Sequence, residues 1–81
     1  EIRLTPIEYA LLRLLLINAG KVLTHRYLLT QVWGPNAVHQ THYLRVHIAN
    51  LREKVEPDPA RPRLIITDSG IGYRLIAPGL G

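Results

Sequence analysis

The spacing of apolar residues changes once along this chain, between residues 56 and 64. Before this point apolar residues recur every three or four positions, which predicts amphipathic helices. After it, residues 64–67 and 73–76 are rich in strand-forming types and flank the turn-forming residues 68–72 (DSGIG), which predicts a β-hairpin. Helices followed by a hairpin predict a single α+β domain over residues 1–81.

Cap residues and helix breakers divide the first part of the chain into three helices. They are expected over residues 6–18, residues 25–33 after a Thr24 cap, and residues 41–55 after a cap at Gln40 or Thr41. Thr5 and Glu8 form a capping-box pattern, with Pro6 at the first helical position. The Gly34-Pro35 pair marks a loop before the third helix. Two helices joined by a short loop, followed by a hairpin, are typical of a winged helix-turn-helix.

The apolar stripes of the helices give the expected core. Its members are Ile7, Ala10, Leu11, Leu14, Leu15 and Ile17, then Leu28, Leu29, Val32 and Trp33, then Leu44, Ile48, Leu51 and Val55. Tyr73 is expected to pack inward from the hairpin, with Arg74 facing the other way. Residues 2–4 are expected to add a short third strand to the hairpin.

Composition favours a small domain with an anionic partner. Ten Lys and Arg against six Asp and Glu leave a net charge of +4, which suits phosphates. The chain has no cysteine, so neither a disulfide nor a thiolate metal site is expected. The longest apolar run, residues 10–17, contains Arg13 and is too short for a bilayer, so no membrane partner is expected. Because there is no methionine, we expect a fragment of a longer protein.

The outward face of residues 41–55 mixes cations, an amide and small apolar groups. On a helix in the major groove of DNA, Asn50 suits adenine, Arg45 suits guanine or a phosphate, and Val46 and Ala49 suit thymine methyl groups. Residues placed to flank toward phosphates are Thr41, His42, His47, Arg52 and Lys54. A solvated face explains the helix pattern equally well, so the pattern alone does not decide between these two interpretations.

Other chemistries have less support. His39, His42 and His47 have no Cys or nearby acid to complete a zinc site, so no metal is expected. The glycines 70 and 72 precede a strand rather than a helix, unlike those of a nucleotide-binding loop. No arrangement of catalytic residues is recognisable, so neither enzyme activity nor a cofactor is expected.

A protein-interaction module is the alternative to a DNA-binding domain. DNA binding predicts that the cations gather on one side of the molecule, whereas an adaptor would scatter them. The cations concerned are Arg45, Arg52, Lys54, Arg61, Arg63 and Arg74. Glu53, in the middle of the outward face, counts slightly against close approach of DNA at that point. Trp33 is expected to pack at the edge of the core, with a contact to the DNA backbone as the lesser alternative.

Four segments together resemble the effector domain of the OmpR/PhoB family of bacterial response regulators. They are LTPIEYALLRLL, GKVLTHRYLLTQVWG, LRVHIANLREKVEPDPARPR and GIGYRL, and the resemblance covers residues 4–76. It implies a winged helix-turn-helix that binds double-stranded DNA in the cytoplasm, as a head-to-tail dimer on direct repeats. It also implies a preceding receiver domain, phosphorylated by a sensor histidine kinase, and a small N-terminal sheet of which residues 2–4 would be the last strand. The stretches WGPNAV, THYLRV and DPARPR are further similar to family members that regulate potassium-transport genes.

The resemblance also implies roles for individual residues by position. Val46 and Asn50 match the main base-contacting positions. The positions that match contacts to the DNA backbone are His42, Tyr43, His47, Ala49, Arg52 and Tyr73. The loop in which relatives contact RNA polymerase corresponds here to Gly34, Pro35, Asn36, Ala37, Val38 and His39.

Four positions depart from the family pattern. Ala49 and Asn50 stand where many relatives carry Arg, so adenine readout is expected rather than guanine readout. Arg45 stands where relatives often carry Asp. Ser69 occupies the position of an arginine that enters the minor groove in some relatives, so the minor-groove contact is expected to be weak or absent and Ser69 is expected to contact the DNA backbone.

Overall fold

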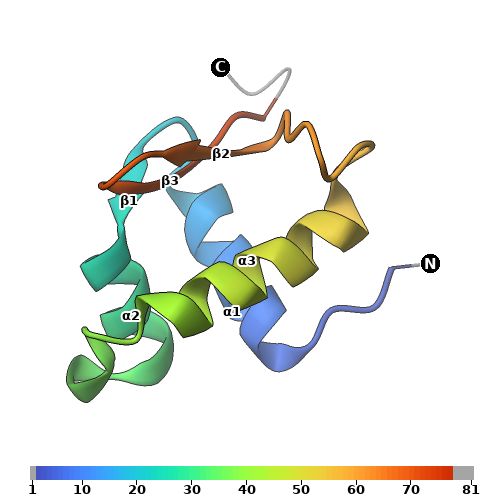
Figure 1. Cartoon of the computed structure of the whole chain (residues 1–81). Helices are drawn as coiled ribbons and strands as arrows, with labels where there is room; N and C mark the ends of the chain where they lie inside the picture. Colours follow the sequence, from blue (N-terminus) through green and yellow to red (C-terminus); the bar gives the residue numbers. More distant parts are fainter. Residues whose placement is uncertain (1, 78–81) are drawn as a thin grey trace.

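A small antiparallel sheet lies on a layer of three helices in the computed structural model, which describes residues 2–77 (Figure 1). The elements in chain order are α1 (Pro6–Ile17), β1 (Val22–Thr24), α2 (His25–Trp33), the 3₁₀ turn η1 (Pro35–Ala37), α3 (Thr41–Val55), β2 (Ile65–Asp68) and β3 (Gly72–Leu75). α2, η1 and α3 form the helix-turn-helix, and the β2–β3 hairpin is the wing. This arrangement confirms the predicted α+β winged-helix fold.

The capping signals place the first two helices as expected. The Glu8 backbone N–H donates to Thr5 Oγ1 at 3.2 Å, and Glu8 Oε1 accepts from the Thr5 backbone N–H at 3.0 Å, which completes a capping box. Thr24 Oγ1 accepts from the Tyr27 backbone N–H at 3.0 Å and caps α2. α3 instead begins after Gln40, whose side chain makes no capping hydrogen bond.

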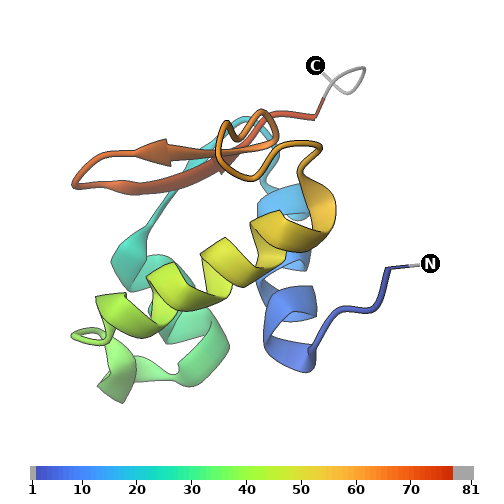
Figure 2. The ribbon, with the colours of Figure 1, turned by 45° about the vertical axis from the view of Figure 1, so that its right-hand side comes forward.

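The sheet has the order β1-β3-β2 with antiparallel pairing throughout, so β3 is central. The predicted hairpin is confirmed, but the prediction of a third strand at residues 2–4 is wrong. β1 is the third strand and places Leu23 opposite Tyr73. Residues 2–4 precede α1 at the end of that helix that lies away from the sheet (Figures 1 and 2). Both edges of β3 are already paired, one with β1 and the other with β2. Gly72 is required in β3, because a Cβ there would collide with the Leu23 carbonyl.

The core lies between the helices and the inner face of the sheet. Its buried members are Leu11, Leu15, Leu23, Leu28, Leu29, Leu44, Ile48, Leu51, Ile65, Tyr73 and Leu75. Partly buried at its edge are Ile7, Leu14, Val32, Trp33 and Val55. The prediction that Ile17 is inward is wrong, since its side chain is 62% exposed. Ile17 follows Leu11 by six residues, and at about 100° per residue its side chain points about 120° away from that of Leu11 around the helix axis.

Two buried carboxylates join segments that are distant in the sequence. Glu8 Oε1 also accepts from Lys54 Nζ, which links α1 to α3. Glu56, directly after α3, accepts backbone N–H groups of Arg63, Leu64 and Ile65, which holds the start of β2 against the end of the helix. The wing therefore has a fixed attachment beside α3.

Candidate nucleic-acid interface

α3 lies below the wing and presents one face away from the rest of the molecule (Figures 1 and 2). Leu44, Ile48 and Leu51 are buried on its inner side. The outer face of α3 consists of the exposed residues His42, Tyr43, Arg45, Val46, Ala49, Asn50 and Glu53. The inner contacts hold the backbone of α3, while these side chains are free to meet a ligand.

The three residues expected to contact bases lie together on this outer face. Arg45, Val46 and Asn50 are all exposed, and Val46 retains 41% of its surface although it is a large apolar residue. Val46 and Asn50 are one helical turn apart, so their side chains are neighbours. Ala49 beside them is exposed too, and its small side chain adds little bulk to this part of the outer face.

His47 lies at the border between α3 and α2. Its ring meets that of Trp33 edge to face, with ring centroids 5.3 Å apart, and its Nδ1 lies 2.8 Å from the Tyr43 carbonyl oxygen. Because a carbonyl only accepts, this bond requires a hydrogen on Nδ1, so Nε2 is the nitrogen that stays available. Trp33 is half-buried, as expected for packing at the core edge. Thr41, at the first position of α3, is half-buried as well.

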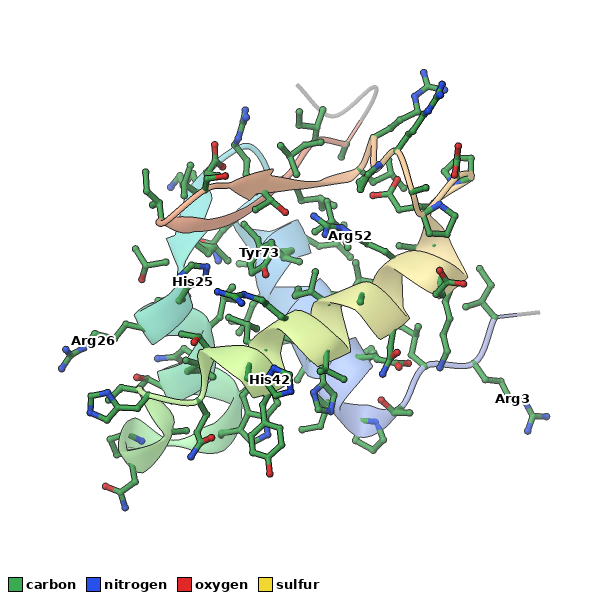
Figure 3. The ribbon with its side chains drawn as sticks, viewed as in Figure 1. Arg3, His25, Arg26, His42, Arg52 and Tyr73 are labelled. Atoms are coloured by element: carbon green, nitrogen blue, oxygen red, sulfur yellow. The ribbon has the colours of Figure 1, made fainter. Side chains whose placement is uncertain are left out.

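Arg52 and Tyr73 lie between α3 and the wing, and Figure 3 shows them side by side there. Arg52 donates to the Ile65 carbonyl through Nε at 3.1 Å and Nη2 at 2.7 Å, and through Nη2 to Thr67 Oγ1 at 2.8 Å. Its guanidinium carbon is 5.6 Å from the centroid of the Tyr73 ring. Tyr73 is 4% exposed, which confirms its inward packing. Burial raises the pKa of the Tyr73 hydroxyl, while the charges of Arg52 and Arg45 oppose that rise.

The expectation that six cations gather on one side is wrong. Lys54 binds Glu8 on the side of α3 that faces α1. It follows Arg45 by nine residues, which at about 100° per residue places the two side chains on opposite sides of the helix. Arg74 pairs with Asp68 at 3.4 Å. The two remaining cations, Arg61 and Arg63, are exposed in the connector after α3. Charge placement therefore does not favour a DNA-binding domain over an adaptor.

The wing tip and the loop after α2 are exposed at different ends of the molecule. Ser69 lies at the tip, beside Gly70, whose φ of 75° the turn requires. In the loop, Pro35, Asn36 and His39 are exposed, and Gly34, Ala37 and Val38 are half-buried. η1 folds these six residues into a compact turn away from the sheet (Figure 1). Their contact with a polymerase stays a prediction.

Three polar residues that no sequence pattern singles out lie beside Tyr73 or at the start of α2, namely His25, Arg26 and Thr67. The His25 ring meets Tyr73 edge to face at 5.6 Å, and Thr67 is the direct cross-strand partner of Tyr73. Arg26 projects from the start of α2 (Figure 3). Thr67 lies beside Tyr73 because β2 pairs with β3, and His25 does so because it directly follows β1, which pairs with the other edge of β3. The sequence did not predict β1.

Two other kinds of site find no counterpart in the described part of the chain. Among residues 2–77, no three His, Asp or Glu side chains form a group suited to a metal ion. Within the same residues, no helix is both long and apolar enough to cross a membrane.

Known proteins are similar to this chain in sequence and in fold. Residues 1–75 match the family model described as "Transcriptional regulatory protein, C terminal". The chain is 64% identical over 76 residues to the KDP operon transcriptional regulatory protein KdpE of Escherichia coli (strain K12), which covers 94% of this chain and 34% of that protein. The chain thus spans about a third of the length of this relative.

Two solved structures extend the comparison. The response regulator DrrB of Thermotoga maritima, an OmpR/PhoB homologue, has a TM-score of 0.74 at 36% identity and covers 94% of this chain and 34% of that one. The DNA-binding domain of the response regulator AdeR, solved with an intercistronic region, has a TM-score of 0.77 at 26% identity, with 94% and 74% covered. The chain therefore belongs to the family of C-terminal domains of transcriptional regulatory proteins, as a winged-helix DNA-binding domain of the OmpR/PhoB response regulators.

Proposed function

We propose that this domain binds double-stranded DNA in a sequence-specific manner, with α3 in the major groove and the wing against the adjoining backbone. The observation that carries the proposal is the outer face of α3, on which Arg45, Val46 and Asn50 are exposed while the inner stripe is buried. The likeness to the AdeR domain supports it, since that domain was solved with DNA. A major groove accepts one α-helix, and none of the elements within residues 2–77 packs over the outer face of α3 (Figure 1).

Asn50 and Val46 would supply the base readout. The Asn50 side chain has an acceptor and a donor that match adenine N6 and N7, and the exposed Val46 would lie against a thymine methyl group. Arg45, on the side of α3 toward the wing, would reach guanine or a phosphate. Ala49 adds no donor, so the readout would favour A·T base pairs.

The exposed His42, Tyr43 and Ser69 are the best-placed candidates for contacts to the DNA backbone. Thr41, Trp33 and His47 are half-buried and would contact phosphate only through their polar tips, namely the hydroxyl, the indole N–H and Nε2. Three further candidates have less freedom. Lys54 is held by Glu8, Tyr73 is buried, and Arg52 is bound to the wing.

The domain would act within a transcription regulator of a two-component system. We propose that a receiver domain, phosphorylated by a sensor histidine kinase, belongs to the same protein, and that two copies bind direct repeats head to tail in the cytoplasm. The compact loop of residues 34–39 would contact RNA polymerase. The name of the E. coli relative refers to the KDP operon, and on this similarity we propose potassium-transport genes as the target.

Asn50→Ala tests the readout on a duplex selected from random DNA. We expect a loss of base preference at one position per half-site, at a cost of about 1–3 kcal/mol in binding free energy. The matched control is Asn36→Ala, which removes an exposed amide in η1 and should leave binding unchanged. If Asn50→Ala instead weakens binding equally on every DNA sequence, Asn50 contacts only the DNA backbone.

A protein-interaction module is the second candidate, because the cations are scattered and Tyr9, Leu16 and Ile17 of α1 are exposed. Such a module would bind a protein through apolar surface, and its affinity for DNA would not depend on sequence. Equal affinity for a selected duplex and its scrambled version would favour this candidate.

A further inference from the structure

Arg52 joins α3 to both strands of the wing. Its guanidinium reaches β2 through the Ile65 carbonyl and the Thr67 hydroxyl, and it lies over the ring of Tyr73 in β3. The side chain is half-buried and lies beneath the sheet in Figure 3. No other contact between α3 and the wing joins one side chain to both strands in the polar interactions of residues 2–77.

The Ile65 carbonyl that receives Arg52 points to the free edge of β2. The preceding carbonyl, that of Leu64, accepts from the Ile76 N–H at 2.7 Å and so points toward the β3 side. Successive carbonyls of a strand point in opposite directions, so that of Ile65 faces away from β3. An edge strand leaves such groups without a partner in the sheet, and Arg52 supplies one from the helix.

These bonds occupy the atoms that Arg52 would need to grip a phosphate. A guanidinium binds an oxyanion in a bidentate manner, through Nε and Nη2 or through Nη1 and Nη2. Nη2 belongs to both pairs, and its two hydrogens are directed to Ile65 and Thr67. Nε is also bonded to Ile65. A phosphate contact of this kind would require Arg52 to release the wing.

We propose that Arg52 is a positioning residue that sets the wing on the recognition helix, rather than a phosphate ligand. By clamping β2 and β3 against α3, it fixes the separation between the major-groove contact and the backbone contact of the wing. The proposal rests on the proposed DNA-binding function. It assigns Arg52 a different role from the one that the resemblance to relatives implied.

The proposal requires arginine rather than any cation at this position. A lysine keeps the charge but offers a single nitrogen on a flexible stem, so it cannot bond the carbonyl through two nitrogens while also lying over the ring. Arg52→Lys and Arg52→Gln should therefore behave alike if Arg52 positions the wing. If Arg52 binds a phosphate, Arg52→Lys should retain most of the affinity and only Arg52→Gln should lose it.

The experiment measures binding to two duplexes that carry the same selected core. One duplex extends beneath the wing and the other ends before it. For the unaltered protein we expect tighter binding to the long duplex, and for both Arg52 variants we expect this gain to fall by about tenfold, equivalent to the loss of one charge-assisted contact. Affinity for the short duplex should change by less than about twofold, because α3 itself is retained. A variant that is merely less stable would lose affinity for both duplexes in equal proportion and would overturn the proposal.

Thr67→Val keeps the test decisive if the Arg52 variants fail to fold. It removes one of the three hydrogen bonds and leaves Arg52 and Tyr73 in place. We expect the gain from the longer duplex to fall by about threefold, and a double-mutant cycle of Arg52→Lys with Thr67→Val to show less than additive losses. Arg13→Lys, at an exposed arginine of α1 to which no contact with DNA is assigned, is the matched control. It should leave the gain from the longer duplex intact.

Hydrogen exchange without DNA separates this proposal from the proposed function. Amides of β2 and β3 should exchange faster in Arg52→Lys than in the unaltered protein, while those of α3 should not change. If the unaltered protein binds no DNA, the proposed function fails and the exchange experiment still tests the clamp. If DNA binds but wing exchange and the gain from the longer duplex are unchanged in both Arg52 variants, the clamp is refuted and the function stands.

Discussion

Replacement of Glu56 by Gln tests how the wing is anchored to α3. Glu56 is buried, with 6% of its surface exposed. Its carboxylate accepts hydrogen bonds from the backbone N–H groups of Arg63 at 2.8 Å, Leu64 at 3.0 Å and Ile65 at 2.7 Å. Oε1 serves Arg63, Oε2 serves Ile65, and Leu64 lies 3.0 Å from both. A glutamine amide replaces one acceptor oxygen by a donor nitrogen. Either Arg63 or Ile65 then loses its partner and faces another donor.

The magnitude follows from that single lost bond. A hydrogen bond to a charged group contributes about 1.5–3 kcal/mol, and a buried donor left unpaired adds a desolvation cost. We expect Glu56→Gln to lower the free energy of unfolding by about 3 kcal/mol, a fall in Tm of about 12–24 °C for a domain of this size. Chemical unfolding followed by circular dichroism measures this change directly.

The effect should depend on pH. Burial alone would raise the pKa of the Glu56 carboxyl, but the N–H groups of Ile65, Arg63 and Leu64 and the charge of Arg52 lower it below its ordinary value of 4.5. A carboxyl with a lowered pKa stabilises the fold above its unfolded pKa, and this contribution is lost as the pH falls through the folded value. The difference between the unaltered protein and Glu56→Gln should therefore be greatest at neutral pH and shrink below 4.5.

Glu53→Gln is the matched control, because it removes the same charge from an exposed site in the last turns of α3. We expect it to change the stability by less than about 0.5 kcal/mol. A Glu56→Gln variant as stable as this control, or a stability difference that widens in acid, would refute the anchoring role of Glu56.

Three further substitutions test other parts of the fold by the same unfolding measurement. Glu8→Gln keeps a cap acceptor for Thr5 but removes the ion pair with the half-buried Lys54, so we expect a loss of about 1–2 kcal/mol. Because the hydrogen bond from Lys54, against the opposing effect of burial, lowers the pKa of Glu8, this loss should fade below 4.5; an unchanged loss in acid would contradict the ion pair. Gly72→Ala should cost more than about 3 kcal/mol, since its Cβ would collide with the Leu23 backbone, and a neutral result would refute the β1–β3 pairing. Leu15→Ala should cost about 2–5 kcal/mol and Ile17→Ala much less, and equal costs would contradict the observed core.

Local signals in the sequence account for most of the fold. The capping box at Thr5, the Thr24 cap and the glycines of the wing turn each act within a few residues, so helix starts and the hairpin could be predicted. β1 could not, because three residues carry too short a pattern and its partner β3 lies about fifty residues further along the chain. The strand-forming residues 2–4 carry an equally short pattern, but they lie at the wrong end of α1 to pair.

The candidate site divides in the same way. The outer face of α3 follows from helical periodicity, so the exposure of Val46 and Asn50 could be predicted from spacing alone. The directions of the flanking cations depend on partners far along the chain. Arg52 is bound thirteen residues away at Ile65, and Lys54 is bound forty-six residues away at Glu8. Spacing along one helix carries no information about such partners, so the predicted gathering of cations failed.

Selection of bound sites from random double-stranded DNA, at two salt concentrations, tests the central claim most directly. We expect one enriched motif that contains A·T pairs at the position of Asn50. For about four to six phosphate contacts, the logarithm of the affinity should fall with the logarithm of the salt concentration with a slope of roughly −4 to −5. Recovery of no shared motif, together with a slope near zero, would contradict sequence-specific DNA binding by this domain.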